Sequence, residues 1–219
     1  MPRIDDYKQA LELGRQKVAG KNPNLIAGFS KAVISRDKKG NISFLLDFLN
    51  REILITWPDL GFSSKNSHEE LSIQEQILLL HYLLGTWSSS GAATTGEWIA
   101  FQDVPDGRFY QDAFMKRAKV PLVKSFGTRP ELLVELANKA YGSTPIDHGD
   151  FSVVVKALPL VPVALILWGG DDEFPPEGNI LFDRNISGIF SAEDIAWLAG
   201  MVVYPLAGMA KGQDPGHKA

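Results

Sequence analysis

An apolar run spans residues 157–167, interrupted only by Pro159 and Pro162, and it leads directly into the segment Trp168-Gly-Gly-Asp-Asp-Glu-Phe-Pro-Pro176. The run predicts two buried strands, residues 150–158 and 161–168, joined by a tight turn at Pro159. Three adjacent carboxylates repel one another, so stability alone does not favour them at a strand end. The segment is therefore expected either to hold a ligand or to build a rigid turn.

The remaining elements form two groups of strands with helices between them. Strands are expected at residues 31–36, 42–47, 52–57 and 97–101, and residues 179–183 are expected to form either a short strand or an extended loop. Helices are expected at 4–19, 72–84, 109–118, 121–126, 128–141 and 191–207. Ser72 and Glu75 have the spacing of a capping box. Residues 59–70 are expected to form a surface loop, and residues 86–96 a mobile loop. This order favours an α+β fold, with antiparallel sheet segments packed with about five helices.

A chain of 219 residues accommodates one large domain or two small ones. The sequence has no internal repeat and no linker rich enough in Pro, Gly or Ser to mark a domain boundary, so a single domain is expected over residues 1–210. Residues 211–219 are expected to be a disordered tail. Pro205 is expected to kink or end the last helix, because proline has no N–H to donate.

Composition excludes several function classes. The formal net charge of −4 argues against a sequence-independent nucleic-acid binder. Residues 153–168 contain Lys156 and two prolines and are too short to span a bilayer. The N-terminus lacks the apolar core of a signal peptide, so a cytoplasmic location is expected. The absence of cysteine excludes disulfides, a Cys nucleophile, and zinc or iron–sulfur sites with Cys ligands from this chain.

Asp171, Asp172 and Glu173 are the first candidates for binding chemistry. At a strand end they could face a cation, an amine or a metal-bound substrate, and carboxylates suit magnesium or calcium. Their spacing is not that of an EF-hand loop. The alternative is structural: an aspartate caps the turn, Phe174 packs into the core, and the two prolines stiffen the exit.

Two more acids have neighbours that could change their role. Asp183 follows the run Ile180-Leu181-Phe182 and could join the acids above, whereas Arg184 could neutralise them in an ion pair. Glu97 precedes Trp98. A carboxyl beside an aromatic ring can have a raised pKa and act as a general acid or base, or it can simply face water on an edge strand.

No other motif points to a defined reaction. No two histidines have the spacing of a helical metal pair, and His81 is expected to be a hydrogen-bonded interior residue. His148 lies between acids in a turn, which favours a surface position over a carboxylate–imidazole pair. The glycines match neither a P-loop nor a dinucleotide-binding motif, and no Gly-x-Ser-x-Gly is present.

Several segments in this order resemble a family of unknown function from anaerobic bacteria and archaea. The resemblance is carried by Leu80-His-Tyr-Leu-Leu84, Gly96-Glu-Trp-Ile-Ala-Phe101, the segment from Trp168 to Pro176, Ile180-Leu-Phe-Asp183, and the helix start at Ser191. Some members are joined to iron–sulfur modules or occur beside corrinoid proteins. The resemblance implies a role in anaerobic redox or one-carbon metabolism. Because this chain lacks cysteine, any cluster would belong to a partner protein.

Together these observations favour a small-molecule or cofactor-binding accessory domain, with a corrinoid or iron–sulfur protein as a possible partner. The candidate pocket residues are Trp87, Glu97, Trp98, Trp168, Asp171, Asp172, Glu173, Asp183 and Arg184. Two alternatives stay open. One is an acid/base enzyme using the clustered carboxylates, with or without magnesium. The other is a protein-interaction module with an exposed apolar patch.

Overall fold

The structure is a computed structural model that describes residues 4–213. It divides into two compact units. The first contains the chain up to Thr94 with Leu158–Leu160 and Gly188–Phe190, and the second contains the rest. Each unit combines helices with an antiparallel sheet, which confirms the α+β prediction. The single domain over residues 1–210 stays a prediction. Of the expected tail, Lys211 and Gly212 end the last helix, and residues 214–219 lie outside the described residues.

Three helices of the first unit pack together: α1 (Ile4–Ala19), α2 (Pro23–Ser30) and α3 (Ile73–Ser88). The predicted capping box of Ser72 and Glu75 is present at the start of α3. Tyr82 is fully buried and donates its hydroxyl to the Ser30 carbonyl at 2.8 Å, which ties α3 to the end of α2. Helix α3 extends further than predicted, so Trp87 lies on a helix and not in a loop.

The sheet of the first unit contains β1 (Val33–Arg36), β2 (Ile42–Phe48), β3 (Arg51–Trp57) and β4 (Phe62–Ser64), in that order. Leu49 and Asn50 turn β2 into β3 with positive φ angles of 51° and 60°, the backbone twist that suits a two-residue hairpin. The expected loop over residues 59–70 is wrong in part, because β4 lies within it. Strand β4 has only three residues, which are too few to show the alternation of apolar and polar residues that predicts a strand.

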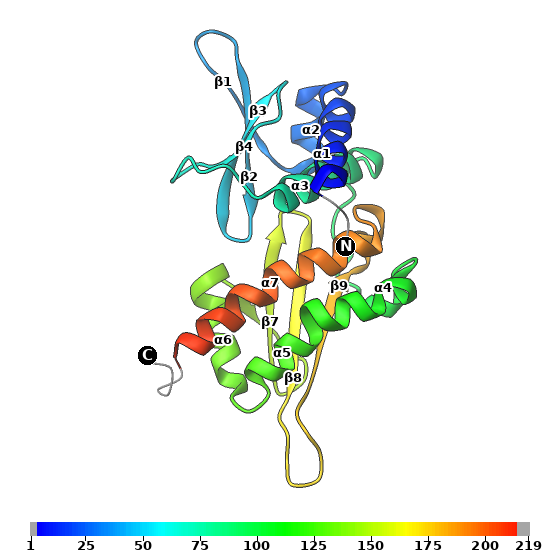
Figure 1. Cartoon of the computed structure of the whole chain (residues 1–219), viewed down its shortest axis with the longest axis vertical. Helices are drawn as coiled ribbons and strands as arrows, with labels where there is room; N and C mark the ends of the chain where they lie inside the picture. Colours follow the sequence, from blue (N-terminus) through cyan, green and yellow to red (C-terminus); the bar gives the residue numbers. More distant parts are fainter. Residues whose placement is uncertain (1–3, 214–219) are drawn as a thin grey trace. The chain divides into compact units, whose positions relative to one another are not determined.

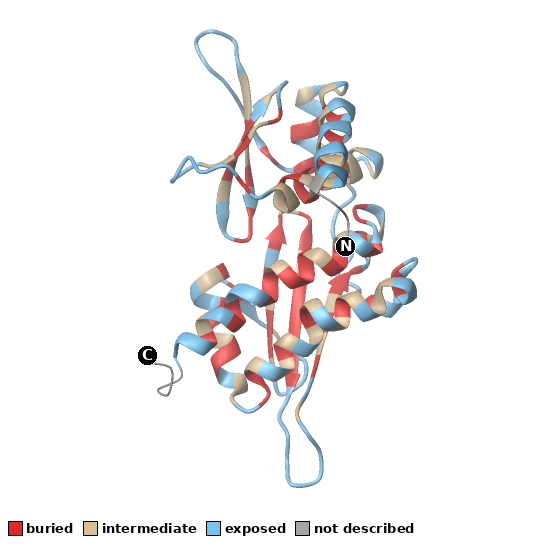
Figure 2. Ribbon diagram, in the orientation of Figure 1, coloured by how far each residue is buried: buried red, intermediate tan, exposed pale blue. Residues whose placement is uncertain are grey.

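The second unit contains β5 (Trp98–Ala100), β6 (Thr144–Pro145), β7 (Phe151–Leu158), β8 (Val161–Trp168) and β9 (Glu177–Asp183), in the spatial order β5-β9-β8-β7-β6. The predicted pair of consecutive strands is confirmed as β7 and β8. Strand β8 is central and almost entirely buried, as Figure 2 shows. The connection from β8 to β9 extends as a long hairpin beyond the neighbouring helices (Figure 1).

Helices of the second unit lie across this sheet (Figure 1). They are α4 (Gly107–Phe114), the π-helical segment η2 (Met115–Lys119), α5 (Val120–Phe126), α6 (Pro130–Tyr141) and α7 (Ala192–Gly212). Two separate helices were expected before residue 127, but α4, η2 and α5 follow one another without a break. Pro121 cannot donate to the carbonyl four residues earlier, and a wider π turn relieves that conflict.

Helix α7 begins at the capping box of Ser191 and Asp194 and continues through Pro205 to Gly212. Pro205 therefore does not end the helix, and the other alternative, a kink at Pro205, stays a prediction. Leu206, Ala207 and Ala210 are buried after the proline, and this packing stabilises the helix despite the missing hydrogen bond. By length and composition α7 could cross a membrane, but 56% of its apolar window is buried inside the fold, as in the core helix of a soluble protein.

Candidate functional site

Four of the nine predicted pocket residues meet at the edge where β5 pairs with β9. Trp98 lies opposite Asp183 in this ladder. Arg184 donates from Nε and Nη2 to the two carboxylate oxygens of Glu97, at 2.5 Å each, and its backbone N–H donates to the Glu97 carbonyl at 2.8 Å. Arg184 thus pairs with Glu97 and not with Asp171, Asp172 or Glu173.

The Glu97 carboxyl does not have the raised pKa of a general acid. The hydrogen bond from Arg184 lowers the pKa of Glu97 below its usual value, and the positive charge of Arg184 acts in the same direction. Both side chains are more than half exposed. Glu97 is therefore an ionised, ion-paired residue at the surface, which fits the alternative that it faces water on an edge strand and not the raised pKa of a general acid.

Asp183 is a structural carboxylate. Its side chain is only 2% exposed and accepts hydrogen bonds from Thr95 N, Thr95 Oγ1, Gly96 N and Asn185 N, at 2.7–3.0 Å. Burial raises the pKa of Asp183, but the hydrogen bonds from Thr95, Asn185 and Gly96 together outweigh it, so the pKa lies below the ordinary value. The carboxylate fixes the end of the 86–96 segment, which was expected to be mobile.

Asp171 also has a structural role. Its Oδ1 accepts hydrogen bonds from Glu173 N at 2.9 Å and Phe174 N at 2.7 Å, and its own N–H donates to the Phe174 carbonyl. The bonds from Phe174 and Glu173 lower the pKa of Asp171. This is the predicted turn cap. Phe174, however, is 67% exposed and does not pack into the core. Asp172 and Glu173 are exposed beside it.

The acids of this turn do not share a pocket with Glu97 and Trp98. Trp168 pairs with Glu177 at the start of β9, whereas Trp98 pairs with Asp183 at its end. Six residues of strand separate the two positions, which is about 20 Å. Trp87 belongs to the other unit, where its ring packs edge-on against Phe29 and lies under the ammonium of Lys21. Among residues 4–213, no three His, Asp or Glu side chains are placed to hold a metal ion.

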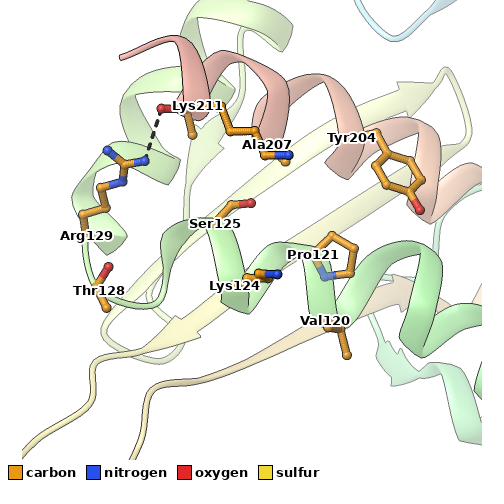
Figure 3. A pocket seen from close by; sticks show the side chains of 10 residues that line it. Val120, Pro121, Lys124, Ser125, Thr128, Arg129, Tyr204, Ala207 and Lys211 are labelled. Carbon is orange, nitrogen blue, oxygen red and sulfur yellow. Dashed lines mark hydrogen bonds between the residues drawn. The ribbon is translucent and has the colours of Figure 1, made fainter. Parts of the chain in front are cut away.

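A concave site lies where the sequence pattern gave no candidate, between α5 and the C-terminal half of α7 (Figure 3). We call it the cationic groove, and its volume is about 730 Å³. It is lined by Val120, Pro121, Lys124, Ser125, Thr128, Arg129, Tyr204, Ala207, Ala210 and Lys211. Three of these side chains are cationic and none is acidic. The groove therefore combines positive charge with a partly apolar wall.

Local structure explains the shape and charge of the groove. The π turn before α5 ends at Lys119, directly before Val120 and Pro121 at one end of the groove. Alanines at positions 207 and 210 leave space on the α7 side. Arg129 donates from Nη2 to the Ala210 carbonyl at 3.2 Å and so satisfies a helix-end acceptor, while Lys124 and Lys211 are exposed.

The charge distribution along the chain contains the signal that would have identified this groove. Although the whole chain is acidic, residues 107–129 hold one acid, Asp112, and six cations: Arg108, Lys116, Arg117, Lys119, Lys124 and Arg129. Not all six are available to a ligand. The Arg117 guanidinium lies 4.2 Å from the centre of the Trp197 ring, for example. Lys124 and Arg129 line the groove, and Arg129 also donates to the Ala210 carbonyl there.

A second, shallower hollow adjoins the cationic groove. Its volume is about 470 Å³, and it is lined by Gly127, Thr128 and residues 169–176 of the β8–β9 hairpin. Thr128 lines both concavities. Gly127 is required here, since a Cβ atom would lie 2.8 Å from Cγ of Pro176. The base of the hairpin is therefore fixed beside the groove.

Comparison with known families places most of the chain in one of them. Residues 22–204 match the domain of unknown function DUF3786. The chain belongs to the DUF3786 family. No curated protein and no solved structure matches the chain. The DUF3786 match begins at residue 22, so the family includes the first sheet as well as the segments on which the sequence resemblance rested.

Proposed function

We propose that this DUF3786 chain is a small-molecule or cofactor-binding accessory domain whose ligand is anionic and partly apolar. The observation that carries the proposal is the cationic groove, with Lys124, Arg129 and Lys211 on its walls and no acid among its lining residues. Val120 and Tyr204 supply exposed apolar surface at the same site, 49% and 54% exposed. Aromatic and aliphatic walls with a few polar groups are typical of ligand sites.

The acid/base enzyme is the weaker candidate. It requires at least two carboxylates that converge on one point. Glu97 is engaged with Arg184, Asp171 with the turn it caps, and Asp183 with backbone N–H groups. These three acids stabilise the fold locally, which supports a binding role over a catalytic one.

A cytoplasmic place in anaerobic corrinoid or redox metabolism is part of the same proposal. It rests on the family resemblance and on the absence of cysteine, which leaves any cluster to a partner protein. A tetrapyrrole with several carboxylates has the chemistry that the groove would recognise, namely a flat apolar ring with an anionic rim. Co-purification with a corrinoid or iron–sulfur protein from anaerobically grown cells tests the metabolic context.

Calorimetric titration of the full chain tests the ligand class. The probes are a tetracarboxylate porphyrin, hydroxocobalamin, citrate and magnesium chloride. The porphyrin is expected to bind, and Lys124→Glu with Lys211→Glu is expected to weaken it at least about tenfold, because hydrogen bonds to charged groups contribute about 1.5–3 kcal/mol. Lys38→Glu with Lys39→Glu makes the same charge change at an exposed turn and should leave binding unchanged. No binding of any probe, or equal loss in both double variants, would overturn the proposal.

A further inference from the structure

The tip of the β8–β9 hairpin, residues 171–174, presents an apolar side chain and two acids in a fixed shape. Phe174 is 67% exposed, with Asp172 and Glu173 exposed beside it. The backbone N–H groups of Glu173 and Phe174 donate to Asp171 Oδ1, and these two hydrogen bonds hold the turn. A tip that is already ordered loses little conformational entropy when it docks.

The cationic groove is complementary to this tip in both charge and polarity. The groove has cations at Lys124, Arg129 and Lys211, and apolar surface at Val120 and Tyr204. The tip offers carboxylates and a phenyl ring. Residues 171–174 are not among the residues lining the groove of their own chain. The tip and the groove thus have complementary charge and polarity, but the tip does not line the groove of its own chain.

Their arrangement allows two copies to exchange tips. Thr128 borders both the groove and the hollow beneath the hairpin, so the two surfaces are neighbours on one compact unit. If a twofold axis relates two copies of the chain, the tip of each copy can enter the cationic groove of the other copy. This contact closes on itself, so the assembly stops at two chains and does not grow into a fibre.

We propose that two copies of this chain form a symmetric dimer in which the tip of each, Asp172-Glu173-Phe174, occupies the cationic groove of the other. The occupant of the groove is then a second copy of the chain. The proposal does not depend on a small ligand, since charge and shape alone carry it. A groove ligand and the tip would compete for the same cations.

A charge-swap experiment on the full chain tests this dimer by sedimentation equilibrium over a concentration series. Asp172→Lys with Glu173→Lys gives a cationic tip facing a cationic groove, and Lys124→Glu with Lys211→Glu gives an acidic tip facing an acidic groove. Each double variant alone is expected to be monomeric, with the dimer dissociation constant raised at least about a hundredfold. An equimolar mixture is expected to form a heterodimer, because both tip–groove contacts are then between opposite charges.

The control is Lys38→Glu with Lys39→Glu, which should dimerise like the native chain. Circular dichroism spectra and thermal midpoints of the variants, measured at low concentration, separate loss of association from loss of fold. A native chain that stays monomeric throughout the series overturns the proposal. So does a dimer that survives the tip variant, or a mixture of the two variants that stays monomeric. Porphyrin binding by monomeric chain bears only on the ligand proposal, so the two can fail separately.

Discussion

Arg184 binds both carboxylate oxygens of Glu97 through Nε and Nη2, and this pair joins residues 87 positions apart in the sequence. The contact follows from strand register, since β5 and β9 place Trp98 opposite Asp183 and so bring the preceding Glu97 beside the following Arg184. The two residues were expected to serve a pocket. In the fold they fasten an edge strand to its neighbour.

Glu97→Gln is expected to change stability only slightly. The pair is exposed, and exposed ion pairs contribute little because water screens them and the side chains lose freedom. The pKa of Glu97 is lowered, so the small contribution is present above the pKa of the unfolded chain and is lost as pH falls through the folded value. Urea denaturation of both proteins at pH 7 and pH 3.5 should therefore show a small difference that shrinks in acid. A large difference at pH 7 would contradict this surface role.

Asp183→Asn is expected to destabilise the second unit by about 2 kcal/mol or more, because several buried N–H donors lose a charged acceptor. The folded pKa of Asp183 is depressed, so its stabilisation is complete above the unfolded value, about 3.9, and declines as pH falls toward the folded value. Denaturation midpoints of native and variant chains should converge below pH 4. Asp112→Asn makes the same change at an exposed position on α4 and should have no effect.

Gly85→Ala is expected to destabilise the first unit by several kcal/mol. An added Cβ would lie 2.0 Å from the backbone carbonyl oxygen of Ile189, and backbone cannot move aside as a flexible side chain can. Gly28→Ala is the matched control, because Gly28 lies within α2 and its Cβ would meet nothing within 4 Å. That variant should be neutral or stabilising by up to about 1 kcal/mol. Thermal midpoints measure both, and equal effects would contradict the close packing at Gly85.

Phe174→Ser is expected to leave the unfolding free energy of the monomer unchanged, since the ring is mostly exposed. Dimer affinity should fall about tenfold or more, because the ring would be buried only in the groove of the second copy. Phe109→Ser removes another exposed phenylalanine, on α4, and should preserve the dimer. Sedimentation equilibrium distinguishes the two. Equal dimer loss in both variants would place the contact elsewhere.

Local signals in the sequence predicted local structure well. The capping boxes at Ser72 and Ser191 are present, and β7 and β8 follow from the continuous apolar run. The turn formed by Asp171 was also foreseen as one of two alternatives. Each of these features depends on residues within about ten positions of one another, so short-range hydrogen bonding and hydrophobic pattern are sufficient to specify them.

The sequence patterns did not predict the features that depend on contacts between segments far apart in the chain. Nothing near Glu97 in the sequence specifies Arg184 as its partner, because β5 pairs with a strand about 80 residues away. The cationic groove arises from two helices, α5 and α7, whose lining residues are small, cationic and apolar with no shared motif. The basic stretch at residues 107–129 belongs to no motif and is visible only in the distribution of charges along the chain.

The buried carboxylate of Asp183 has a further consequence for a chain with no cysteine. It binds Thr95 and Gly96, 88 and 87 positions earlier, and so closes a long loop that a secreted protein would commonly close with a disulfide. A cross-link made of hydrogen bonds to one anion is indifferent to oxidants and reductants. It responds to acidity instead, so the junction keeps its strength whatever the reduction potential around it.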